Sequence, residues 1–250
     1  MSYENCKINQ SSFKLNGVII RKFLTLGITS FLAEIALVIS MAAVQNTCMK
    51  YGALDSIFGQ EEYAQIPLAV LGIVMKFFQI TVSISIGIAA GCIPIAGYNI
   101  GANNINRVKK LFTYLLLAEV IVGSIALIIV ECFPLQIANL FGAANESGYY
   151  TTFVIKCFRI YLCMMVLATV NKGTFIFLQS LGKAISSTIV SLTREIILGV
   201  LLPIIMPIFM GLDGLLWSFP VADILTFIVA LFFIIKTYQE LNRDLLYSIN

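Results

Sequence analysis

Long apolar runs are the feature of this 250-residue sequence that most restricts its fold. A stretch of about 20 apolar residues makes a helix long enough to cross the ~30 Å hydrocarbon layer of a membrane. About six runs of that length can be drawn, at 23–48, 66–90, 110–131, 152–178, 185–208 and 214–236. They predict an all-α, polytopic membrane protein built as a bundle of six transmembrane helices.

The composition agrees with a membrane location and argues against several kinds of site. Hydrophobic residues make up 59% of the chain and charged residues 12%, whereas soluble domains are about 25% charged. There is no histidine, which removes Ser-His and Cys-His catalysis and histidine-ligated metals. The six cysteines form no CxxC pair and lie mostly in apolar runs. We therefore expect no enzyme, no metal site and no cofactor.

The charges of the connecting segments alternate along the chain. Ten of the sixteen basic residues fall at the N-terminus or after the second, fourth and sixth runs. The intervening segments carry acids, with Lys50 as their one base. By the positive-inside rule the basic segments, and both termini, are cytoplasmic. We expect a cytoplasmic segment at 1–22, a six-helix lobe at 23–236 and a cytoplasmic tail at 237–250, in the plasma membrane. Basic residues placed by topology do not indicate nucleic-acid binding.

Several charged residues fall inside the predicted spans. They are Glu34, Lys76, Glu119, Lys172, Arg194, Glu195 and Asp223. A charge near the bilayer centre costs about 2.5–3.5 kcal/mol on insertion scales, so such residues pair or face a water-filled cavity. One interpretation is structural pairing, for instance of Lys76 with Glu34 or Glu119, and of the adjacent charges at 194–195. The other is an ion-binding cavity for transport, with Glu34 and Asp223 as the best candidates.

Small residues and prolines indicate how the predicted helices pack and bend. Gly123 recurs with Glu119 on one face of the third predicted helix, where small residues let helices approach closely. Pro203 and Pro207 should bend or end the fifth helix, and Pro220 should distort the start of the sixth.

The stretch GCIPIAGYNIGANNINRVKK, residues 91–110, follows an apolar run and ends in a basic cluster. Proline removes a backbone donor, and glycine permits conformations and close approaches that a Cβ would block. Gly91, Pro94 and Gly101 therefore predict an irregular, close-packed end to the second helix at the cytoplasmic face. Arg107 belongs to the basic group that should lie against anionic lipids.

Four segments together resemble one known family. They are LGITSFLAE (26–34), GIAAGCIPIAGYNIGANNINRVKK (87–110), FLQSLGKAISSTIVSLTREIIL (177–198) and GLDGLLWSFPVADIL (211–225). In order and spacing they resemble segments of multidrug and toxin extrusion (MATE) transporters. The second segment, with its Tyr98-Asn99 pair followed by a Gly-Ala dipeptide and a basic run, is the most specific match.

The resemblance implies a fold and a set of site residues. Transporters of this family have two six-helix lobes around a central cavity, and the chain resembles the second lobe. Asp223 falls on the acidic position of the final-helix pattern and Arg194 on the arginine of the helix before it. Glu34 lies about one turn from a position where some members carry a coupling carboxylate. Where some members have an acid on the tenth helix, this sequence has Asn171 and Lys172.

The resulting hypothesis is half of a secondary antiporter that exports organic cations or drugs in exchange for H⁺ or Na⁺. Alternating access needs an opposing wall, so a second six-helix lobe, on a separate chain or in a second copy, is expected as a partner besides membrane lipids. Two alternatives stay open: a non-transporting truncated fragment or accessory subunit, and, with less support, half of a lipid or polysaccharide flippase.

Overall fold

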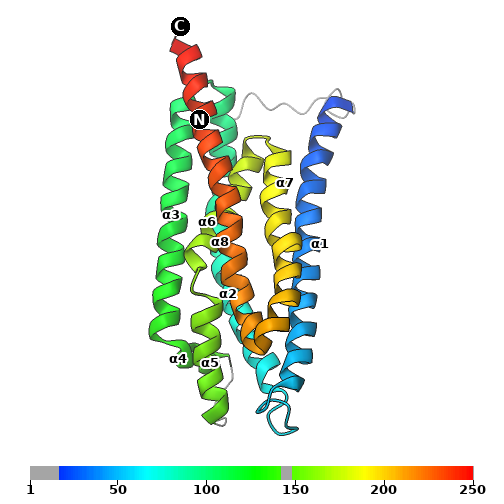
Figure 1. Ribbon diagram of the computed structural model, residues 1–250. Coiled ribbons are helices and arrows are strands. Elements are labelled where there is room, and N and C mark those ends of the chain that lie inside the picture. The colour runs from blue at the N-terminus through cyan, green and yellow to red at the C-terminus, as the bar shows by residue number, and fades with distance from the viewer. Residues whose placement is uncertain (1–16, 142–147, 250) are drawn as a thin grey trace, which may run out of the picture.

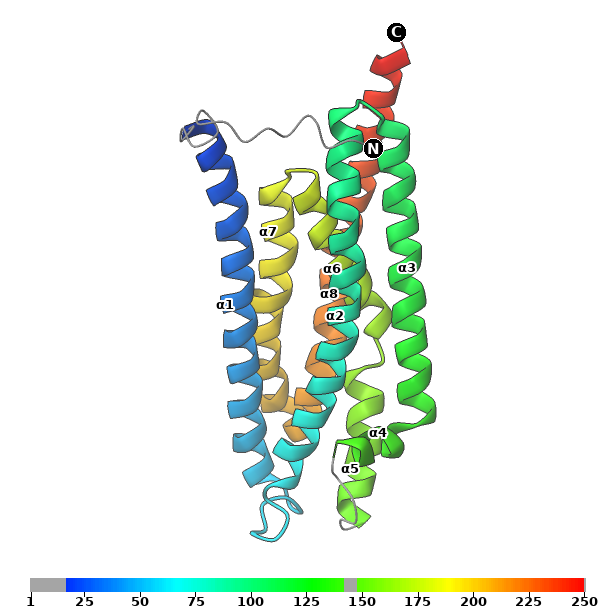
Figure 2. The same cartoon turned by 180° about the vertical axis from the view of Figure 1, so that it is seen from behind.

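The computed structural model describes residues 17–141 and 148–249, and all its regular elements in these ranges are helices (Figure 1). In chain order they are α1 (Gly17–Leu54), α2 (Ile66–Gly101), α3 (Ile105–Cys132), α4 (Pro134–Leu140), α5 (Gly148–Tyr161), α6 (Met165–Ser180), α7 (Ala184–Leu192), the π-helix η2 (Thr193–Leu198) and α8 (Gly199–Ile249). The long helices run roughly parallel to one axis, as seen from both sides (Figure 2). The all-α prediction is confirmed.

Within the described ranges, four helical segments are long and apolar enough to span a membrane. Three are α2, α3 and the part of α1 at Phe31–Leu54. The fourth is the continuous stretch Ala184–Arg243, 60 residues long. A fifth candidate is the pair formed by α5 and α6, which bends by 45° at a short break.

The 60-residue stretch contains two passages. Gly211 has φ 59° and ψ −141°, which is not helical, and it joins two helices across a kink. Figure 1 shows the chain descending through α7 into the first part of α8 and then returning to the opposite end. Glycine suits this position because a positive φ carries no Cβ penalty. With the two limbs counted separately and α5–α6 as one bent span, the described chain makes the six predicted passages.

The prolines of α8 lie inside its helical limbs. Pro203 and Pro207 precede the reversal at Gly211, and Pro220 follows it. The fifth predicted span therefore ends at the glycine, a few residues beyond the prolines. The bend within the fourth span is a further departure from a straight helix. There Cys163 N–H donates to the Ile160 carbonyl at 3.5 Å, which is a three-residue bond in place of the four-residue pattern.

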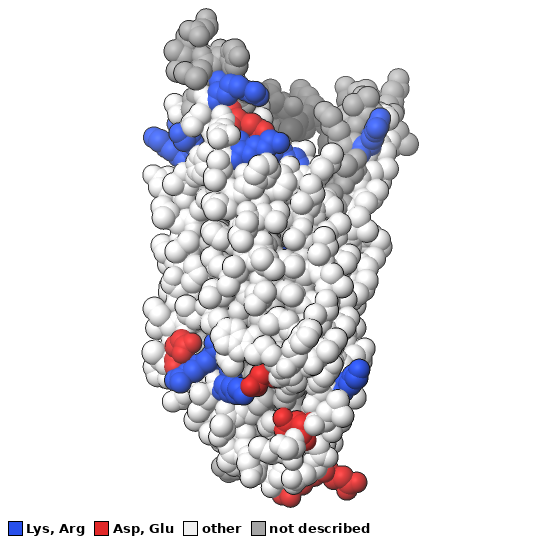
Figure 3. Space-filling view, in the orientation of Figure 1, with Lys and Arg blue, Asp and Glu red and all other residues white. Residues whose placement is uncertain are grey.

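Charged side chains gather toward the two ends of the bundle, with a white band of uncharged residues between them (Figure 3). At the end opposite the α2–α3 turn, Lys156 Nζ lies 2.7 Å from Asp213 Oδ2, and Arg159 Nε lies 3.3 Å from Glu131 Oε2. Both bases fall within the fourth predicted span, 152–178. They lie near the start of that span, where they neutralise acids of neighbouring segments.

The ends of the predicted lobe shift in the structure. α1 begins at Gly17, so the part of the 1–22 segment at 17–22 is helical, and residues 1–16 lie outside the described residues. α8 continues to Ile249, so most of the predicted 237–250 tail is helix. Thr237 and Leu241 are buried, and Lys183 pairs with Glu240. The first turns of this segment therefore belong to the packed bundle.

The prediction of an irregular, close-packed end to the second helix is wrong. α2 stays helical through Gly91 and Pro94 to Gly101, and a Cβ added at either glycine would meet no atom within 4 Å. Proline removes only one backbone bond, and an apolar surrounding favours keeping the others. The reversal comes at Asn103, which has φ 53°, a conformation that asparagine adopts more readily than most residues.

The other residues of this motif occupy ordinary positions around that turn. Asn99 is buried and its Nδ2 donates to the Ile95 carbonyl at 2.8 Å, within α2. Tyr98 and Arg107 are exposed. Arg107 lies in the first turn of α3, and its N–H donates to the Asn104 carbonyl at 3.0 Å. The motif is thus a helix end and a tight turn.

Two apolar clusters fill the bundle, one toward each end, with polar side chains between them. Along α2, the first cluster takes residues from 66–75 and the second from 89–96. The buried Thr81 and Ser85 lie between these ranges. α8 repeats the order, with the buried Asp223 between apolar residues of both clusters. A polar layer at mid-depth is therefore built into several helices at once.

The close approach of α3 to α6 depends on the small size of Gly123. A Cβ at Gly123 would lie 2.6 Å from Thr169 Oγ1 and 2.6 Å from the Val166 Cα. Gly123→Ala should lower the free energy of unfolding by about 1–3 kcal/mol, because a backbone atom must move. Gly91→Ala, also within a helix but facing open space, should be neutral or slightly stabilising. Thermal unfolding of the detergent-purified variants measures both, and equal effects would contradict this packing.

Candidate functional site

A cavity of about 230 Å³ opens in the polar layer. Its walls come from α1, α2, α6, α7, η2 and α8. The apolar part of the wall includes Phe78 and Phe175. The polar lining residues are Glu34, Gln79, Ser83, Asn171, Lys172, Ser191, Arg194, Glu195 and Thr226. A largely apolar pocket with a few convergent polar groups is the usual form of a small-molecule site.

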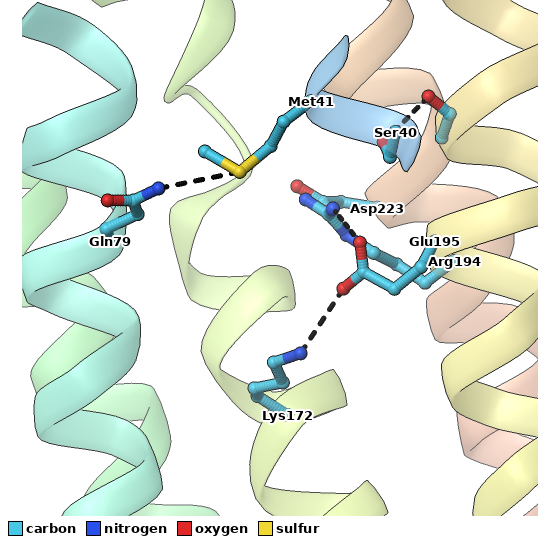
Figure 4. Close-up of polar contacts among 8 residues, drawn as sticks. Ser40, Met41, Gln79, Lys172, Arg194, Glu195 and Asp223 are labelled. Atoms are coloured by element: carbon cyan, nitrogen blue, oxygen red, sulfur yellow. Dashed lines mark hydrogen bonds and ion pairs between the residues drawn. The ribbon is translucent and has the colours of Figure 1, made fainter. Parts of the chain in front are cut away.

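A chain of ion pairs crosses one wall of this cavity (Figure 4). Lys172 Nζ lies 3.2 Å from Glu195 Oε1, and Arg194 Nη1 lies 3.1 Å from Glu195 Oε2. Arg194 Nε donates to Asp223 Oδ1 at 3.2 Å. Two cations and two carboxylates alternate, so the group is neutral as a whole. Asn171 Nδ2 donates to the backbone carbonyl of Asp223 at 3.1 Å and joins α6 to α8.

The π-helix η2 places two adjacent residues, Arg194 and Glu195, in the same chain of ion pairs. η2 holds Arg194 and Glu195 in its first turn, between α7 and α8. A π-turn widens the helix locally, and such insertions are frequent at functional sites. Ser40 Oγ donates to the Gly199 carbonyl at 2.8 Å just beyond η2. A Cβ added at Gly199 would lie 2.6 Å from the Ser40 hydroxyl oxygen. α1 therefore packs directly against the end of the π-helix.

Two aromatic rings lie close to the Arg194 guanidinium. Its Cζ lies 5.3 Å from the centre of the Phe78 ring and 5.6 Å from that of Phe219. Arginine stacked on aromatic rings gains cation–π attraction when it is partly desolvated. The head group is therefore fixed by two carboxylates and two rings, and it acts as the central element of the site.

Several buried polar atoms of the cavity lining have no protein partner among the described residues. They are Asn171 Oδ1, Ser191 Oγ, Arg194 Nη2 and Thr226 Oγ1. A buried polar atom without a partner costs free energy unless water or a ligand satisfies it. Clustering of these atoms around one cavity indicates that its contents are polar in part.

Glu34 differs from the other acids of the cavity. It is exposed in this chain, and it makes no ion pair with any residue in the described ranges. It lines the main cavity and also a neighbouring one that it shares with Lys172. Glu34 is thus a carboxylate that reaches the cavity without a neutralising cation.

The structure gathers some of the predicted site residues and leaves others apart. Around the cavity it brings together Glu34, Asn171, Lys172, Arg194 and, through Arg194, Asp223. Lys76 is exposed and forms no ion pair within the described ranges, so its suggested pairing with Glu34 or Glu119 is wrong.

Glu119 is fully buried elsewhere and is bonded by Ser85. Glu195, assigned in advance only to a structural pair with Arg194, in fact bridges Arg194 and Lys172 at the cavity wall. Ser191 and Thr226 were missed. A small polar residue in an apolar helix is too common a signal to single them out.

The fold defines a multi-pass α-helical membrane protein with a polar cavity at mid-depth. The family model described as MatE matches residues 40–205. That range covers most of the chain and includes η2 and most of the cavity wall. The chain therefore belongs to the MatE family, whose members are transporters and not enzymes.

Among similar proteins are multidrug export proteins of staphylococci. The chain is 21% identical over 241 residues to the multidrug export protein MepA of Staphylococcus haemolyticus, which covers 96% of this chain and 50% of that protein. It is 24% identical over 182 residues to MepA of Staphylococcus aureus strain MSSA476, with 73% of this chain and 39% of that protein covered. The chain thus spans about half the length or less of these relatives.

Solved structures show the same fold. A crystal structure of MATE in complex with MaL6 superposes with a TM-score of 0.82 at 18% identity, covering 95% of this chain and 51% of that one. An outward-facing multidrug resistance MATE family transporter of the MOP superfamily gives a TM-score of 0.81 at 18% identity, covering 95% and 50%. The bundle described above therefore has the fold of half of such a transporter.

The Arg194–Asp223 pair can be tested by a double-mutant cycle. Arg194→Gln should lower the free energy of unfolding by about 3–5 kcal/mol, because it leaves a buried carboxylate without its cation. Adding Asp223→Asn should recover part of this loss, with a coupling energy of about 0.5–3 kcal/mol. Denaturant unfolding in detergent measures the four species. Strict additivity would show that the two side chains do not interact.

Proposed function

We propose that this chain forms the C-terminal lobe of a MATE-type exporter that moves organic cations or drugs out of the cell in exchange for H⁺ or Na⁺. The unneutralised Glu34 carboxylate at a polar, aromatic-walled cavity is the observation that carries the proposal. Membership of the MatE family, and the multidrug export named for its staphylococcal relatives, give it support.

The charges of the cavity favour a cationic substrate. Lys172, Arg194, Glu195 and Asp223 neutralise one another through ion pairs of 3.1–3.2 Å. Glu34 is the acid that remains, so the cavity carries a net negative charge when Glu34 is ionised. An ionised carboxylate attracts a cation by Coulomb attraction, and Glu34 lines this cavity.

The small volume of the cavity is consistent with a substrate site that a second lobe completes. Pockets for drug-sized molecules are commonly about 300–1,000 Å³, and this one is about 230 Å³. One lobe therefore offers part of such a site. A second six-helix lobe placed opposite, on another polypeptide or in a second copy, would complete it. Rocking of one lobe against the other would then expose the site to each side of the membrane in turn.

Glu34 and Asp223 are the proposed ion-coupling residues, with unequal parts. Asp223 is buried and bonded to Arg194, so it can take up H⁺ or Na⁺ only when that ion pair opens. Glu34 can exchange its ion for a substrate directly. Both termini lie on the cytoplasmic side of the plasma membrane in this proposal, because the basic clusters flank the end of the bundle where the described chain begins and ends (Figure 3).

Substrate binding can be measured on the purified chain with tetraphenylphosphonium, a permanent organic cation. Isothermal titration should show binding to the unchanged protein that weakens about tenfold, or 1.4 kcal/mol, in Glu34→Gln. Glu61→Gln removes one negative charge from an exposed side chain between α1 and α2 and is the matched control. Equal losses in both variants would reduce the effect to net charge, and no loss in Glu34→Gln would remove Glu34 from the binding site.

Transport can be measured by efflux of a cationic dye from proteoliposomes under an H⁺ or Na⁺ gradient. Vesicles that hold a single copy of this chain should not transport, because one lobe lacks the opposing wall. Efflux by single-copy vesicles would contradict the paired-lobe proposal. Where a second lobe restores efflux, Glu34→Gln and Asp223→Asn should each abolish its dependence on the ion gradient.

A further inference from the structure

A second buried acid lies outside the cavity, where α2, α3 and α6 meet. Glu119 of α3 has no solvent exposure. Ser85 Oγ of α2 is hydrogen-bonded to its Oε2, and Thr169 Oγ1 of α6 donates to its backbone carbonyl at 2.9 Å. Its other carboxyl oxygen, Oε1, is buried and has no partner among the described residues.

This carboxyl has no cationic partner among the described residues. None of the ion pairs in the described ranges includes Glu119. The basic residue of α6 is Lys172, and its Nζ forms an ion pair with Glu195 at 3.2 Å. On α2 the titratable side chain that interacts with the Glu119 carboxyl is the Cys92 thiol. An ionised carboxylate in such a place would be desolvated and uncompensated, and a group in that position normally becomes neutral instead.

Ser85 can donate a hydrogen bond to the Thr169 carbonyl and still be bonded to Glu119 only when Glu119 carries a proton. Ser85 has a single hydroxyl hydrogen and two acceptors in reach, the Glu119 carboxyl and the Thr169 carbonyl at 3.4 Å. With Glu119 protonated, its O–H donates to Ser85 Oγ, and the Ser85 hydroxyl donates to the Thr169 carbonyl. The unpartnered Oε1 is then a neutral carbonyl oxygen, which is far less costly to bury than a charged one.

The packing leaves no room for a hydrated ion at this position. A Cβ added at Gly173 would lie 2.7 Å from Glu119 Cγ and 2.9 Å from Oε1. The backbone of α6 thus lies directly against the carboxyl group. A bare proton fits such a site, whereas Na⁺ needs several oxygen ligands around it.

We propose that Glu119 is a proton-binding site inside this lobe, separate from the cavity, and that its proton joins α3 to α2 and α6. Loss of the proton places a negative charge against Gly173 and removes one bond of the Glu119–Ser85–Thr169 chain. The contact of the three helices is therefore weaker in the deprotonated form. This inference rests on the contact of α2, α3 and α6 alone and does not depend on the proposed substrate or partner lobe.

Infrared spectroscopy of the purified chain in phosphatidylcholine bilayers tests the protonation directly. A protonated carboxylic acid gives a C=O stretching band distinct from the bands of a carboxylate. At neutral pH we expect this band in the unchanged protein, shifted by ¹³C-glutamate labelling and absent from Glu119→Gln. Glu34→Gln, which changes an acid of the cavity, should leave it in place. A labelled protein with carboxylate bands alone at neutral pH would overturn the proposal.

Ser85→Ala keeps the test valid if Glu119→Gln does not fold. This variant retains the carboxyl group and removes its hydroxyl partner, so the acid band should persist and move to higher frequency. An unchanged band would overturn the hydrogen-bond chain.

The unfolding temperature tests whether the Glu119 proton stabilises the contact of α2, α3 and α6. In the unchanged protein, the unfolding temperature should fall between neutral and alkaline pH, and it should fall as much in Glu34→Gln and Cys92→Ala. It should fall less in Glu119→Gln, whose amide does not titrate. The same fall in all four proteins would overturn the link between the proton and helix packing.

Discussion

Neutralising charge inside an apolar layer is the constraint on which the rest of this structure depends. The bundle meets it in two ways. Around Arg194, two cations and two carboxylates compensate one another, and the rings of Phe78 and Phe219 flank the guanidinium. At Glu119, a hydroxyl and, in our proposal, a bound proton take the place of a cation. Glu34 has neither a cation partner nor such a hydroxyl in the described ranges, and the proposed cation site rests on this carboxylate.

Helix geometry makes these solutions possible. The π-helix brings Arg194 and Glu195 to the same wall, and the break near Cys163 bends α6 away from the line of α5. Gly123 lets α6 approach α3 closely enough for Thr169 to reach the Glu119 backbone. Each irregularity lies at the polar layer or next to it, so the departures from a straight helix and the polar contacts belong together.

The sequence predicted the fold well and the site in part. Hydropathy located six passages because a span must be long and apolar, and composition marked the buried acids because each is costly there. The sequence-based prediction failed at Gly91 and Pro94, which lie within a continuous helix. They remain helical because an apolar surrounding penalises every lost backbone hydrogen bond. The sequence could not show that Lys172, rather than Lys76, would reach an acid, because that choice depends on helix rotation and on an unforeseen π-turn.

The claim that a wet, polar cavity lies within this apolar bundle is tested most directly by thiol labelling. In a cysteine-free chain reconstituted in lipid, Ser83→Cys places a thiol in the cavity lining, and Ile121→Cys places one on the exposed apolar face of α3. A charged, membrane-impermeant thiol reagent should modify the cysteine at 83 and leave the one at 121 unmodified. Protection at 83, or equal modification at both, would contradict the account.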